Sequence, residues 1–120
     1  MTEKRSIIKD KSFAFAFRVI KLYEYLTETK KEYVISKQLL RSGTAIGALV
    51  REAQNGESTK DFIHKLSISQ KECDETICWL ELLKEKEYLN EKEFESINPE
   101  AIELLKMLRS AIITSKKNNL

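Results

Sequence analysis

The sequence has few residues that break or end regular structure. Its 120 residues include three glycines and one proline, too few turn formers for a sandwich or barrel of many short strands. Apolar residues make up 42% of the chain and charged residues 33%, a balance typical of a helical protein with a buried core. This length fits a single domain over residues 1–120 that needs no disulfide bond or structural metal to fold.

Cysteine and histidine are also scarce. The two cysteines, Cys73 and Cys78, point in different directions on one helix, which argues against a disulfide bond between them. The one histidine, His64, falls on the opposite side of the same helix from Cys73, so no metal-binding pattern is present. We expect two reduced, partly buried thiols and no cofactor.

Long apolar runs are missing too. No segment approaches the roughly 20 apolar residues that a transmembrane helix needs, and the N-terminal residues lack the apolar core of a signal peptide. We therefore expect a cytoplasmic protein with no membrane partner. The net charge is +2, from 21 basic and 19 acidic side chains. This value neither favours nor excludes a nucleic-acid partner, so only the distribution of charge along the chain is informative.

Hydrophobic periodicity predicts four helices, over residues 12–29, 34–55, 58–87 and 91–115. Ser12, Ser58 and Asn90 are suitable N-caps, and Gly56 follows the second helix as a stop signal. Pro99 interrupts the apolar stripe of the last helix, and the continuity of that stripe favours a kink over a break. Short connections make neighbouring helices antiparallel, so we predict an all-α, up-down-up-down four-helix bundle.

Three of the predicted helices carry features that call for a close neighbour. Glycine inside a helix costs up to about 1 kcal/mol relative to alanine, so Gly43 and Gly47 predict the close approach of another backbone. The first helix is apolar over roughly 220° of its circumference, wider than the stripe of an ordinary surface helix. The third helix has an aromatic and acidic patch off its core side. We therefore predict an interface between copies of this chain, formed by Phe13, Phe17, Ile68 and Trp79.

Basic residues form two rows on the predicted helices. On the second helix, Lys37, Arg41 and Arg51 fall within about 80° of one another. On the third helix, Lys60 and Lys71 form a second row. Flexible or forked cations in a row can contact successive phosphates. These five residues are therefore the candidate nucleic-acid-binding residues.

The same basic residues are also compatible with simpler roles. A charged helix face is usually just solvated, and Arg41 could equally form an ion pair with Glu72 or Glu75 of a neighbouring subunit. Catalysis has the least support, because His64 has no carboxylate within the same turn and no helix carries the Glu-x-x-His pattern of a two-metal site. We expect no enzyme activity.

Five segments in series resemble the four-helix-bundle family that is also called the ribosomal 23S intervening-sequence protein family. These segments are Ser12–Val19, Lys37–Ala48, Arg51–Asn55, Asp61–Glu72 and Thr76–Leu83. The resemblance implies a cytoplasmic bacterial protein of four antiparallel helices that assembles as a homopentamer around a central channel. Some members are encoded inside insertions in large-subunit ribosomal RNA genes. A related branch resembles the accessory variability protein of diversity-generating retroelements, which binds nucleic acid and a reverse transcriptase.

Two functional hypotheses follow from the residues and the resemblance. The first is a non-enzymatic, homo-oligomeric scaffold that binds RNA or DNA through the basic rows. The alternative is an adaptor whose oligomer docks a protein partner and has no nucleic-acid role. This sequence has Leu49 where the family often carries asparagine, so no polar role is transferred to that position.

Overall fold

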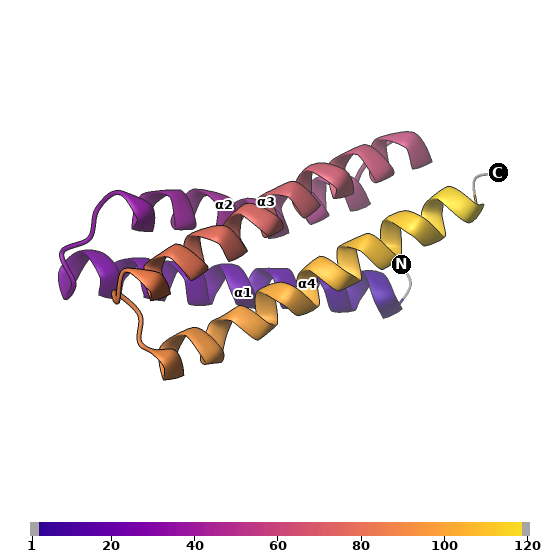
Figure 1. Ribbon diagram of the computed structural model, residues 1–120. Coiled ribbons are helices and arrows are strands. Elements are labelled where there is room, and N and C mark those ends of the chain that lie inside the picture. Colours follow the sequence, from indigo (N-terminus) through magenta and orange to yellow (C-terminus); the bar gives the residue numbers. More distant parts are fainter. Residues whose placement is uncertain (1–2, 119–120) are drawn as a thin grey trace.

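Four helices account for most of the chain. The computed structural model describes residues 3–118, and its helices are α1 (Glu3–Glu28), α2 (Ile35–Gln54), α3 (Thr59–Glu85) and α4 (Glu91–Asn118). Each helix packs on the next along the chain, and α4 also packs on α1. Figure 1 shows that consecutive helices run in opposite directions. The predicted all-α, up-down-up-down bundle is therefore confirmed.

The start of α1 is the largest error in the predicted boundaries. The helix begins at Glu3 rather than at Ser12, because Ile8 continues the buried stripe of Phe15 toward the N-terminus. Ser12 is not an N-cap: it is fully buried inside the helix, and its hydroxyl donates to the carbonyl oxygen of Lys9 at 3.1 Å. The spacing of Ile8 and Phe15 already fits one helical face, so the sequence did contain a signal for the earlier start.

The other helix ends lie within about one turn of their predicted positions. Ser58 caps α3, since its hydroxyl oxygen accepts from the backbone N–H of Asp61 at 3.0 Å. Asn90 and Glu93 cap α4 reciprocally, each side chain accepting from the other's backbone N–H at 2.8 Å. Helix α4 continues through Pro99 as one helix, so a break at this position is excluded.

The glycines of α2 let α1 approach closely. A methyl group on Gly47 would lie 3.2 Å from the backbone carbonyl oxygen of Ser12, which confirms the expected approach of another backbone. A methyl group on Gly43 would lie 2.8 Å from both γ-carbons of Val19, so here the neighbour is a side chain instead. The close contact between α1 and α2 offsets the cost of two glycines inside a helix.

The core lies between the four helices, and every helix contributes to it. Its largest fully buried side chains include Phe15, Leu26, Leu39, Ile46, Leu66, Leu80, Leu104 and Leu108. Two hydrogen bonds join α2 and α3 inside this core. The Thr76 and Ser42 hydroxyls are 2.9 Å apart, and the Ser69 hydroxyl donates to the carbonyl oxygen of Ile46 at 2.9 Å. These buried hydroxyls therefore have partners, as buried polar groups in folded proteins require.

A buried carboxylate, for which the sequence pattern gave no signal, fixes the connection between α1 and α2. Glu32 is 7% exposed and accepts hydrogen bonds from the backbone N–H groups of Val34 at 3.0 Å, Ile35 at 2.9 Å and Ser36 at 2.6 Å. Burial raises the pKa of Glu32, but the hydrogen bonds from these three N–H groups outweigh that effect. The pKa of Glu32 therefore lies below its ordinary value of 4.5.

Replacement of Glu32 by Gln should lower the free energy of unfolding at neutral pH by about 1 kcal/mol, because an amide is a weaker acceptor at a helix N-terminus than a carboxylate. Since the folded-state pKa is lowered, the stabilisation by Glu32 is present above pH 4.5 and is lost as the pH falls through the folded-state pKa. Urea unfolding at neutral and acidic pH should therefore show a smaller pH effect for Glu32→Gln than for the unaltered protein. The exposed Glu28→Gln is the control, and equal pH effects in Glu32→Gln and the unaltered protein would contradict this role.

Candidate functional site

The outward side of α1 carries large apolar side chains that residues 3–118 leave exposed. Phe13 is 60% exposed, Phe17 is 55% exposed and Ile20 is 42% exposed. Their spacing of four and three residues places them on one side of the helix. A contiguous apolar patch of this kind usually marks an interaction surface. Phe13 and Phe17 thus have the exposure that the predicted interface requires.

The other two residues of the predicted interface lie differently. Ile68 and Trp79 are half-buried, and Trp79 packs against the core of its own chain. The indole Nε1 of Trp79 is buried without an acceptor among residues 3–118. Phe13 and Phe17 are therefore the more exposed part of the predicted interface, and the assignment of Ile68 and Trp79 to it stays a prediction.

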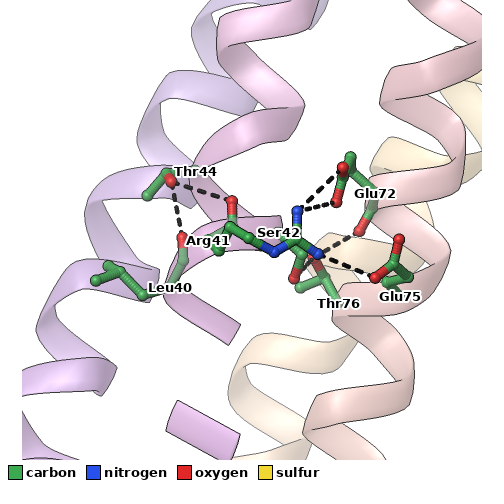
Figure 2. Close-up of polar contacts among 7 residues, drawn as sticks. All are labelled: Leu40, Arg41, Ser42, Thr44, Glu72, Glu75 and Thr76. Atoms are coloured by element: carbon green, nitrogen blue, oxygen red, sulfur yellow. Dashed lines mark hydrogen bonds and ion pairs between the residues drawn. The ribbon is translucent and has the colours of Figure 1, made fainter. Parts of the chain in front are cut away.

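Arg41 extends from α2 to two carboxylates of α3, as Figure 2 shows. Its guanidinium donates to the Glu72 carboxylate at 3.1 and 3.2 Å and to Glu75 at 3.0 Å. The expected alternative of a pair between subunits is therefore corrected to a pair within one chain. The hydrogen bond and charge of Glu72, with a smaller effect of Glu75, raise the pKa of Arg41. Two carboxylates balance this cation, so Arg41 is less available to a phosphate than its sequence position indicated.

The other four predicted phosphate contacts are exposed on α2 and α3: Lys37, Arg51, Lys60 and Lys71. None of them forms an ion pair with another residue between positions 3 and 118. Helices α2 and α3 pack directly on each other, and all four cations lie on their outward sides. The bundle thus brings both predicted rows to one pair of neighbouring helices.

Ion pairs occupy the seam between α2 and α3, which is the line along which the exposed sides of these two helices meet. The Lys65 ammonium of α3 lies 3.1 Å from the Glu52 carboxylate of α2, and Arg41 crosses the same seam further along. The guanidinium of Arg51 lies 5.3 Å from the centroid of the Phe13 ring on α1. Arg51 therefore connects the basic row of α2 to the exposed apolar side of α1. The seam itself has little free charge, and unpaired cations lie on either side of it.

The cysteines are free, and neither lies in a metal-binding cluster. Among residues 3–118, no group of three or more histidine, cysteine, aspartate or glutamate side chains is placed to hold a metal ion. The buried Cys73 thiol donates to the carbonyl oxygen of Ala101 at 3.2 Å, and burial raises its pKa to about 12. Cys78 is exposed, so the expectation of a partly buried thiol is wrong at this position.

No helix within the described part of the chain has the length and apolar character needed to cross a bilayer.

Comparison with known proteins identifies a family and similar solved structures. The model of the 23S rRNA-intervening sequence protein family matches residues 4–110. A crystal structure of a protein of unknown function, from the S23 ribosomal protein family of Bacteroides thetaiotaomicron, is 50% identical in sequence. The match covers 91% of this chain and 97% of that protein, with a TM-score of 0.89. No protein of curated function matches the chain.

The different burial of the two cysteines predicts different reactivity. Cys78 should react with a thiol reagent such as DTNB in the folded protein, whereas Cys73 should react only after unfolding, because it is buried and has a pKa of about 12. An absorbance titration should therefore detect one thiol per chain in buffer and both thiols in denaturant. Cys78→Ser should abolish the reaction of the folded protein. A fast reaction that persists in Cys78→Ser would contradict the burial of Cys73.

Proposed function

Since the chain belongs to the 23S rRNA-intervening sequence protein family, we propose that it is a non-enzymatic, cytoplasmic scaffold that assembles from copies of itself and binds RNA or DNA. The observation that carries this proposal is the exposed apolar side of α1 next to unpaired cations of α2, where Arg51 lies against Phe13. The proposed stoichiometry is the pentamer that the family resemblance implies.

Self-association is supported by the amount of apolar surface on α1. Phe13 and Phe17 each have more than half of their surface in water in the single chain. Burial of apolar surface contributes about 25 cal/mol per Å², so two phenylalanines at the centre of a contact add substantially to association. Aromatic side chains are also enriched at the centres of protein interfaces.

Nucleic-acid binding is supported by cations that form no ion pair with another residue of the described range, 3–118. On α2, Lys37 and Arg51 are separated by about 21 Å along the helix axis, a length over which a nucleic acid presents several phosphates. Each phosphate contact releases counterions, so binding through these rows would weaken as the salt concentration rises. Assembly would repeat the rows on every copy and increase the effective concentration of contacts.

Replacement of Phe17 by Lys should reduce assembly without unfolding the chain, because Phe17 is 55% exposed and a buried unpaired ammonium is unfavourable in a contact. Light scattering should report a smaller mass for Phe17→Lys at micromolar concentration, with unchanged helix content by circular dichroism. Val34→Lys is the matched control, since Val34 is 74% exposed in the connection between α1 and α2 and lies away from the Phe17 face. An unaltered mass for Phe17→Lys would argue against this contact.

Removal of two unpaired cations should weaken nucleic-acid binding. We expect Lys37→Ala/Lys71→Ala to lower the affinity for labelled RNA or DNA several-fold at about 50 mM salt and to reduce the salt dependence. Lys92→Ala/Lys117→Ala removes the same charge from exposed positions of α4 and is the control. Fluorescence anisotropy measures both affinities. An assembled protein that binds no nucleic acid at this salt concentration would reject the nucleic-acid role and favour the adaptor alternative.

A further inference from the structure

The outward side of α4 carries a row of exposed residues that none of the features above uses. This α4 stripe consists of Glu95, Pro99, Ile102 and Lys106, all exposed and separated by four, three and four positions. The four residues line a shallow cavity of about 610 Å³, whose wall also includes Phe94, Asn98 and Glu103. The α4 stripe thus has a carboxylate near its N-terminal end, an apolar hollow in the middle and an ammonium near its C-terminal end.

The outward side of α1 has the same order of chemistry. This α1 stripe consists of Asp10, Phe13, Phe17 and Lys21, all exposed and separated by three, four and four positions. The Lys21 ammonium lies 5.0 Å from the centroid of the Phe17 ring. In contrast to the hollow of the α4 stripe, the middle of the α1 stripe projects, because its two phenylalanines are 60% and 55% exposed.

We infer that the α1 stripe of one copy packs antiparallel on the α4 stripe of the next copy. This inference rests on the proposed self-association and names its two surfaces. Both stripes span eleven positions, about 16 Å, so their ends coincide when they are paired. The antiparallel orientation places Asp10 opposite Lys106 and Lys21 opposite Glu95. A parallel orientation would place like charges together, which is unfavourable.

The four charged residues at the ends of the stripes are available for such pairs. None of them forms an ion pair within residues 3–118. By contrast, Glu103 at the edge of the cavity already lies 2.6 Å from Lys11 of its own chain. The charges at the ends of the two stripes are therefore open to ion pairs with another copy.

The hollow of the α4 stripe distinguishes this arrangement from a symmetric contact of α1 with α1. Two α1 stripes would also match their charges in an antiparallel pair, but both surfaces would project. The α4 stripe offers Phe13 and Phe17 a concave surface with Pro99 and Ile102 in it. In the wall of this cavity, Asn98 is 9% exposed, and its amide oxygen is buried without a donor among the described residues. A second copy on this surface covers the hollow, whereas an α1–α1 contact leaves it open.

The use of two stripes also limits the type of assembly. Helices α1 and α4 are neighbours in the bundle, and the two stripes are different surfaces of one copy. A contact between two different surfaces joins copies head to tail. Such a contact forms a closed ring where the rotation between successive copies closes, and an open helical filament where it does not.

Cross-linking between single-cysteine variants tests this pairing. All variants carry Cys78→Ser, and the buried Cys73 with its pKa of about 12 stays unreactive. Lys21→Cys protein with a size tag is refolded together with untagged Glu95→Cys protein and treated with a short bifunctional thiol reagent. We expect a tagged–untagged dimer from this mixture. The matched control replaces Glu95→Cys by Lys106→Cys, which should lose the dimer because an antiparallel contact places Lys106 at the other end.

The remaining outcomes separate this inference from the proposed function. An α1–α1 contact would give a dimer when Asp10→Cys is mixed with Lys21→Cys and no dimer when Lys21→Cys is mixed with Glu95→Cys. That result would overturn the inference, while the proposed self-association would stand. An assembled protein with no cross-link in either mixture would also overturn it. A protein that light scattering shows to be monomeric at micromolar concentration would overturn both. A Lys21→Glu variant that loses assembly and regains it with Glu95→Lys would support the pairing independently.

Discussion

The close contact between α1 and α2 determines how the rest of the surface is arranged. Gly47 leaves room for the backbone of Ser12, and Gly43 leaves room for the side chain of Val19. These contacts fix the rotation of α1 about its own axis. Since each residue advances a helix by about 100°, a helix that turns Phe15 and Val19 inward must turn Phe13 and Phe17 outward. The exposed aromatic side of α1 is thus a consequence of how tightly α1 packs on α2.

The seam between α2 and α3 shows how neighbouring residues take different roles. Ser42 points inward, where its hydroxyl lies 2.9 Å from that of Thr76 in the core. The preceding residue, Arg41, points outward and pairs with Glu72 and Glu75 at the surface (Figure 2). Exposed ion pairs contribute little to stability, so their main effect here is on the distribution of charge. They neutralise the seam and leave unpaired cations on either side of it.

The two functional surfaces that we propose are therefore adjacent rather than separate. Arg51 belongs to the basic row of α2 and also lies against Phe13 on α1. A copy that docks on α1 would thus end close to the cations that we assign to nucleic-acid binding. This proximity allows assembly to place the basic rows of several copies along one continuous surface, which is how a weak contact with each phosphate adds up to useful affinity.

The sequence by itself determined the four helices, most of their ends and the tight contact at Gly47, because periodicity, capping and helix propensity depend on residues within a turn or two of each other. Tertiary structure decided what the local pattern left ambiguous. Serine is favoured both as an N-cap and as a small buried residue, and the close approach of Gly47 on α2 shows that Ser12 is the second. Likewise, Arg41 and its partners are 31 and 34 positions apart, so their pairing depends on the rotation and axial shift of two packed helices. The same dependence decided that Trp79 packs on its own core while Phe13 and Phe17 remain exposed.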